Sequence, residues 1–111
     1  MGYELHITLA DNWLHSTQRP IAEAAWMALV DTDPSLEIRS ADYYEYREST
    51  TGEVKRIHPV VWTAHPKEPA AFWFMHGEIR MKNPDDLVVE KMKEIATKLG
   101  ANLLGDEGEE Y

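Results

Sequence analysis

Hydrophobic and polar residues alternate along several segments of the chain, which is the pattern of half-buried strands. The first lies at residues 3–9, where every second side chain is apolar. Further segments that predict strands are residues 36–39, 42–48, 53–63, 78–82 and 101–104. Residues 42–48 and 53–63 flank a turn at 49–52, in which Gly52 can adopt a positive φ, so they predict a hairpin. Pro59 indicates an edge position or a bulge in its second strand.

Two segments have the period of amphipathic helices instead. The first covers about 20–32, with Ser16 or Thr17 as cap and Pro20 in the first turn. Its predicted core face contains Ile21, Ala25, Trp26, Leu29 and Val30. The second covers about 84–99, between a predicted N-cap at Asn83 and Gly100 at its end. The core stripe of this second helix contains Val88, Met92, Ile95 and Leu99.

The order of these elements predicts an α+β fold. We expect a mainly antiparallel sheet of about five or six strands, with both helices packed on one face. The other face, which the polar positions of the strands line, is expected to be uncovered. Residues 70–75 fit either a strand or a buried helical turn. Residues 1–111 are expected to form a single domain.

The net charge of −9 and the absence of cysteine limit the classes of function. Disulfides and cysteine-ligated metals are excluded. Nucleic acids and anionic lipids are disfavoured, because basic residues supply most of the affinity for them. A basic protein is the favoured partner, since an acidic protein attracts it over long range. The alternative is that the acidity only keeps the protein in solution.

The compartment is expected to be the cytoplasm. No apolar stretch approaches the length of a membrane span, and the first residues do not resemble a secretory signal. The five histidines show no metal-binding spacing and the glycines form no phosphate-binding loop, so the sequence predicts neither a metal nor another cofactor. His6 can meet His58 only if their strands are neighbours.

Aromatic and histidine residues around residues 62–76 are the first candidates for binding. They are Trp62, His65, Trp73, Phe74 and His76. Successive side chains of a strand point to opposite faces, so 72–74 cannot all face one core, and at least one ring is expected at a groove or interface. Asp106 and Glu107, in the acidic segment near the end of the chain, are candidates for docking a basic partner.

The two ends of the chain resemble an uncharacterised family of small bacterial proteins. The resemblance is carried by Gly2-Tyr-Glu-Leu-His-Ile-Thr8 at the start and by Leu99-Gly-Ala101 with Gly105-Asp-Glu-Gly-Glu109 and a final tyrosine near the end. An arginine is common in that family directly after the Ile-Thr pair, where this chain has Leu9. The resemblance implies kinship but no activity.

Two functions follow as hypotheses. The first is a protein-binding module, for example an immunity protein or inhibitor of a cationic partner. The second is a small-ligand-binding protein or enzyme whose pocket contains Trp62, His65, Trp73 and His76. The lack of a catalytic motif favours the first, and the sequence does not indicate the oligomeric state.

Overall fold

The computed structural model describes residues 3–47 and 51–111. Its strands are β1 (Glu4–Thr8), β2 (Leu36–Ile38), β3 (Tyr44–Arg47), β4 (Val54–Ile57), β5 (Val60–Trp62), β6 (Ala70–Met75), β7 (Glu78–Lys82) and β8 (Asn102–Gly105). Its helices are α1 (Glu23–Thr32), α2 (Asp86–Leu99) and a short 3₁₀ helix, η1 (Trp13–His15).

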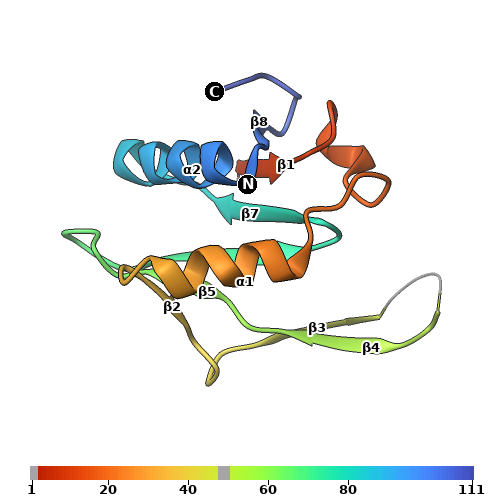
Figure 1. The fold of residues 1–111 in the computed structure, drawn as a ribbon, viewed down its shortest axis with the longest axis horizontal. Coiled ribbons are helices and arrows are strands. Elements are labelled where there is room, and N and C mark those ends of the chain that lie inside the picture. Colours follow the sequence, from red (N-terminus) through yellow and green to blue (C-terminus); the bar gives the residue numbers. More distant parts are fainter. Residues whose placement is uncertain (1–2, 48–50) are drawn as a thin grey trace.

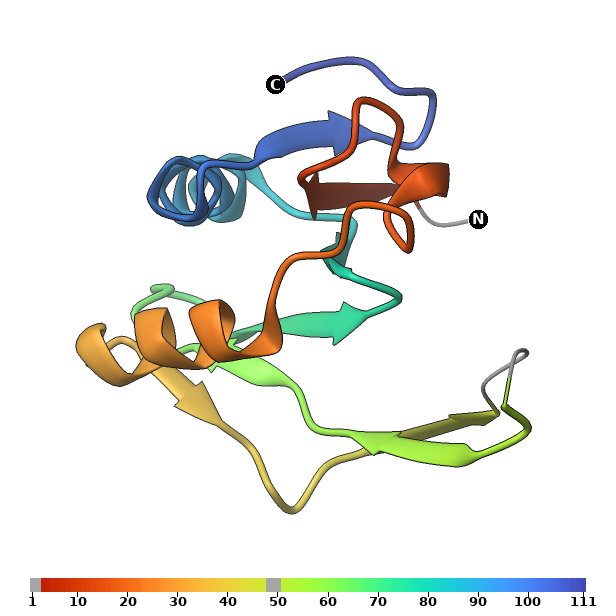
Figure 2. The same ribbon diagram turned by 45° about the vertical axis from the view of Figure 1, so that its right-hand side comes forward.

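Six strands form one antiparallel sheet in the order β2-β5-β6-β7-β1-β8, whereas β3 and β4 pair only with each other. The N-terminal strand is therefore inserted between β7 and β8, the two strands that flank α2 in the sequence. Both α-helices cover the same face of the sheet (Figures 1 and 2). The predicted α+β fold is confirmed.

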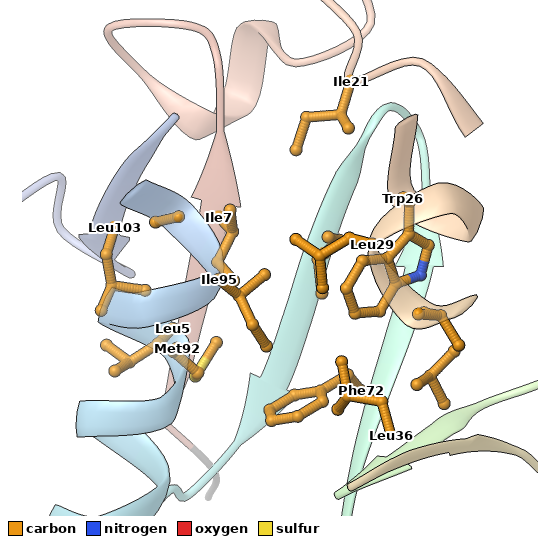
Figure 3. Packing of buried hydrophobic residues seen from close by; sticks show 14 of the residues in the cluster. Leu5, Ile7, Ile21, Trp26, Leu29, Leu36, Phe72, Met92, Ile95 and Leu103 are labelled. Atoms are coloured by element: carbon orange, nitrogen blue, oxygen red, sulfur yellow. The ribbon is translucent and has the colours of Figure 1, made fainter. Parts of the chain in front are cut away.

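The hydrophobic core lies between this face and the two helices. Trp26 and Leu29 of α1 and Met92 and Ile95 of α2 point toward the sheet, where they meet side chains such as Phe72 (Figure 3). The alternation predicted for residues 3–9 is confirmed, because the side chains of β1 that face the helices belong to this cluster.

The first helix begins later than predicted. It starts at Glu23 after Ala22, which makes no side-chain capping hydrogen bond, so neither Ser16 nor Thr17 caps it. Ser16 instead hydrogen-bonds Thr8 and the carbonyl of Trp13. The predicted core face was wrong at Ala25, which is exposed.

The second helix is capped by Asp85 rather than by Asn83. The side chain of Asp85 accepts a hydrogen bond from the backbone N–H of Val88. Asn83 has a positive φ of 50° and its side chain accepts from the N–H of Tyr3, so it connects β1 to the end of β7. The predicted end at Gly100 is confirmed.

Residues 70–75 form a strand, β6, which settles the ambiguity of that segment. The predicted hairpin is confirmed for β3 and β4, and Gly52 has a positive φ; residues 48–50 of its turn lie outside the described residues. Pro59 separates β4 from β5, so the ribbon leaves the main sheet at this point and projects from the body as an arm (Figure 2).

Neither of the α-helices in the described part of the chain is long and apolar enough to cross a membrane.

Candidate functional site

Polar and charged side chains of the sheet lie on the face that the helices leave uncovered, and we call this face the open face. The register places His6 of β1 opposite Arg80 of β7 and opposite Leu104 of β8. Arg80 is in turn opposite Trp73 of β6. Because paired residues of antiparallel strands share a face, these side chains form one row across four strands.

His6 is the most deeply buried titratable group of this row, with an exposed fraction of 0%. Its Nδ1 contacts Oε1 of Glu78, a residue with 1% exposure, and its Nε2 is 2.7 Å from Oδ1 of Asp106. Nε of Arg80 lies 3.4 Å from the same Glu78 oxygen. We call His6, Glu78, Arg80 and Asp106 the His6 cluster.

A lid of two segments buries His6 on this face. The indole ring of Trp13, from η1, stacks on the imidazole with ring centroids 4.0 Å apart. Its Nε1–H donates a hydrogen bond to the carbonyl of Asp106 at 3.0 Å. The carboxylate of Asp106 also accepts from the backbone N–H of Glu4 at 3.0 Å. The open face is thus covered at β1, although the sequence analysis expected it to be uncovered.

The contacts of His6 favour its protonated form. Burial alone lowers the pKa of the imidazole, but hydrogen bonds to Glu78 and Asp106 raise it, and the net direction is upward from 6.5. The pKa of Asp106 is lowered despite its partial burial, because its carboxylate accepts hydrogen bonds from His6 and from the N–H of Glu4. Both ring nitrogens then donate to carboxylates, which is possible only for an imidazolium.

This geometry determines what the cluster can do chemically. A general base needs a free lone pair on one ring nitrogen, and both nitrogens of His6 are engaged. His6 therefore serves as a hydrogen-bond donor to both carboxylates, and its contact with Asp106 helps to hold the lid and the segment after β8 on the sheet. No group of three or more residues suited to binding a metal ion occurs in residues 3–47 and 51–111.

Beside the His6 cluster, the open face continues as a groove of about 610 Å³. It arises because β6 pairs with β5 only at residues 70–72, and β4, which follows the rest of β6, does not pair with it. Trp73, Met75 and Arg80 line the sheet side, and Tyr44 and Ile57 line the arm side. The rings of Tyr44 and Trp73 meet edge to face with centroids 6.5 Å apart. Glu4, Ala71, Met81 and Lys82 complete the lining.

The single pocket predicted around Trp62, His65, Trp73 and His76 is not formed. Trp62 and His65 meet each other near the start of β6, with ring centroids 5.9 Å apart. His76 follows the last residue of β6 and contacts Tyr46. Six residues of strand separate these ends, a span of about 20 Å. Sequence proximity misled here, because an extended strand carries its two ends far apart.

The remaining candidates are also distributed over the molecule. Phe74 packs against the core, on the face opposite to Trp73. Asp106 belongs to the His6 cluster, whereas Glu107 is exposed beside it. His65 bonds Asp85 through Nε2 at 2.6 Å, which joins the loop after β5 to the start of α2. His6 does not meet His58, which bonds the carbonyl of Asp42.

Sequence reasoning missed Trp13, Glu78 and Arg80 as partners of His6. The one available signal was that His6 and Glu78 occupy the polar positions of two alternating segments. That these segments are neighbours follows from the insertion of β1 beside β7, which links residues 72 positions apart. Local patterns do not contain this information.

Comparison of the chain with models of protein families, with curated proteins and with solved structures gives no match. The resemblance carried by the two ends of the chain therefore stays a prediction.

Proposed function

We propose that the protein is a protein-binding module that contacts its partner through the β3–β4 hairpin, residues 44–57, which we call the arm. The proposal rests on the distribution of exposed apolar side chains. In the described part of the chain, the large hydrophobic residues that are exposed are Leu14, Ile38, Tyr43, Tyr44, Val54, Leu87 and Tyr111. Three of these seven lie on the arm or directly before it, namely Tyr43, Tyr44 and Val54, whereas the other four are scattered over the rest of the molecule.

The arm is poorly explained as a part of the core. It is a two-stranded ribbon outside the six-stranded sheet, and such hairpins are only marginally stable on their own. Tyr43 and Tyr44 remain 51% and 52% exposed, and Val54 remains 56% exposed. Aromatic side chains presented in this way are typical anchors of protein interfaces.

The outer edges of the arm offer a second kind of contact. β3 and β4 pair only with each other, so each has one edge without a strand partner. Such an edge can hydrogen-bond an extended segment of another chain. Rings and backbone edge together fit a partner that lies along the ribbon.

A basic protein is the partner that the charge favours. The chain carries −9, whereas the sequence of the arm has three acidic and three basic side chains, so the excess lies elsewhere. That excess accelerates the approach of a basic partner, and the rings then make the short-range contacts. Arg56 already lies 4.2 Å from the ring centroid of Tyr43, which illustrates how such a ring accommodates a guanidinium. Immunity or inhibition directed at a cationic protein is the sharpest form of this proposal.

Site-specific photo-crosslinking tests the arm directly. A photoreactive phenylalanine analogue is placed at Tyr44 in one variant and at Leu87, an exposed residue of α2, in another. The product of the neighbouring gene is the first candidate partner. We expect a crosslink from position 44 only, together with a complex in gel filtration at low salt that weakens as salt rises.

Two further variants distinguish binding by the arm from non-specific binding by any exposed apolar side chain. Val54→Ser removes an exposed apolar side chain from the arm, and Leu14→Ser removes one from η1. The first is expected to weaken the complex and the second to leave it unchanged. Equal crosslinking from positions 44 and 87 would count against the arm, and a complex that strengthens with salt would count against a basic partner.

A further inference from the structure

We infer that the groove is a binding site for an apolar carboxylate, meaning an aromatic or aliphatic group that carries a carboxylate close to it. This site goes beyond partner binding by the arm and does not rest on it. Arg80, Trp73 and Tyr44 carry the inference, and all three line the groove.

Arg80 has hydrogen-bond donors that the described residues leave unused. Its Nε is buried and makes no hydrogen bond. The closest carboxylate oxygen is Oε1 of Glu78 at 3.4 Å, and that oxygen already accepts from His6. Within residues 3–47 and 51–111, the terminal nitrogens of the guanidinium make no hydrogen bond, and its ion-pair partner is Glu78. A carboxylate in the groove can accept two parallel hydrogen bonds from these terminal nitrogens.

The His6 cluster holds Arg80 in place for this role. Its side chain is only 23% exposed, between Glu78 on its own strand and the row that runs from Trp73 to His6. A guanidinium that is fixed before the ligand arrives loses little conformational entropy on binding.

Apolar walls surround the exposed part of Arg80. Tyr44 and Trp73 form an edge-to-face pair, and Met75 and Ile57 extend the apolar surface. These groups favour a ligand whose carboxylate is attached to a ring or an aliphatic chain. A ligand that fills the groove displaces water from beside Arg80, which strengthens the ion pair between Arg80 and the carboxylate.

The charges around the groove favour an anion over a cation. His6 and Arg80 balance Glu78 and Asp106 within the cluster. Beyond them, Lys82 is opposite Glu4 in the register of β1 and β7. The lining of the groove itself contains two basic side chains, Arg80 and Lys82, and one acidic side chain, Glu4, so it favours an anion although the whole chain carries −9.

Nuclear magnetic resonance of the ¹⁵N-labelled full chain tests the site. The probe is N-acetylphenylalanine, and its amide, which lacks the carboxylate, is the matched control. We expect the acid to shift the indole signal of Trp73 and the Hε signal of Arg80 saturably. The indole signal of Trp26, which is buried under α1 on the helix side, should not move. The amide should bind at least about tenfold more weakly.

Matched variants identify the group that holds the carboxylate. Arg80→Gln should weaken binding by at least about tenfold, whereas Lys93→Gln, which removes an equal charge from α2, should change it by less than about twofold. A melting curve establishes that each variant is folded. Should Arg80→Gln fail to fold, Tyr44→Ala takes its place, because Tyr44 belongs to the arm and lies outside the His6 cluster; it should weaken binding at least about threefold.

A second ligand, a short peptide, distinguishes two sources of the carboxylate. A five-residue peptide that ends in phenylalanine with a free carboxylate is compared with N-acetylphenylalanine. If the peptide binds about tenfold more tightly, the site takes the end of a polypeptide chain; equal binding assigns it to a free acid. No saturable shift at Trp73, equal binding of acid and amide, or full binding by folded Arg80→Gln would each overturn the inference.

Discussion

The indole ring of Trp13 lies parallel to the imidazole of His6, with 3° between their planes. Trp13 comes from η1 and His6 from β1, the strand before it, so η1 folds back over the strand that precedes it in the sequence. The indole face can stabilise a cation and also shields it from water. A buried charge in this fold is therefore enclosed by two carboxylates and one ring.

The stability of the protein should fall as pH rises above neutral. The folded protein binds the His6 proton more tightly than the unfolded chain does, because the pKa of His6 is raised above 6.5. The stabilisation is then complete below the unfolded pKa and is lost as pH rises through the folded pKa. Urea unfolding between pH 5.5 and 9, values chosen to bracket the ordinary histidine pKa of about 6.5, measures the effect.

A histidine outside the cluster provides the control for this measurement. His15→Gln removes an exposed histidine and should leave the slope of stability against pH unchanged. A free energy of unfolding that stays constant or increases across this range would contradict the assigned role of His6.

Asp106 and Glu107 are adjacent acids with different surroundings, and their amide variants should separate accordingly. Asp106→Asn removes the negative charge beside Nε2 of His6 and weakens acceptance from the N–H of Glu4. We expect a loss of about 1–3 kcal/mol in the free energy of unfolding. Glu107→Gln removes the same charge from an exposed site and should change it by less than about 0.5 kcal/mol. Equal effects in chemical denaturation would show that only net charge matters.

Alternation and helical period predicted most of the elements, because both patterns are local. The second helix shows how far such signals reach. Its core stripe and its end at Gly100 follow from residues within it, but its start depends on Asn83, whose side chain binds Tyr3 at the other end of the chain. Asn83 is a residue type that often caps helices, but here its side chain makes a tertiary contact instead and Asp85 is the cap.

The candidate site was less predictable, because it depends on which strands are neighbours. His6 meets Glu78 and Asp106 only because β1 lies between β7 and β8 and its polar face is covered. Trp73 was expected at a groove, and it lines one, but with Tyr44 and Arg80 rather than with His65. The pairing of rings with histidines close in sequence was the misleading signal.

Lys91 should stabilise the packing of the two helices through an ion pair with Asp33. It belongs to α2, is 9% exposed, and its Nζ lies 2.6 Å from Oδ2 of Asp33, the residue that ends α1. The hydrogen bond from Lys91 lowers the pKa of Asp33 to about 2. Asp33→Asn leaves the ammonium of Lys91 without this carboxylate, so we expect a loss of about 1–3 kcal/mol.

The acid dependence of this pair has the opposite sign to that of His6. The contribution of Asp33 is present above the ordinary pKa of 3.8 and is lost as pH falls toward about 2. When urea unfolding is measured at a series of pH values, the free energies of unfolding of wild type and Asp33→Asn should therefore converge at the lowest pH. Asp31→Asn, at an exposed position of α1, is the control. If Asp33→Asn had the same small effect as this control, the ion pair would not stabilise the contact between the helices.

Gly77, in the turn between β6 and β7, should tolerate no side chain. Its φ is +79°, and a Cβ would lie 2.7 Å from the carbonyl oxygen of Ser16 and 2.8 Å from Cβ of Pro20. The segment before α1 cannot move away easily, because the N–H of Ile21 donates to the carbonyl of Gly77. Gly77→Ala should therefore cost at least about 2 kcal/mol, from backbone strain and overpacking together.

Gly100→Ala isolates the backbone part of this cost. Gly100 also has a positive φ, +66°, but a Cβ there would meet no atom within 4 Å. This variant should lose only about 1–2 kcal/mol, the cost of a left-handed conformation for a residue with a Cβ. The difference between the two variants in urea unfolding then measures the packing of the segment before α1 against the β6–β7 turn. If the two alanine variants were equally stable, that segment would not be packed as closely as the contacts of Gly77 require.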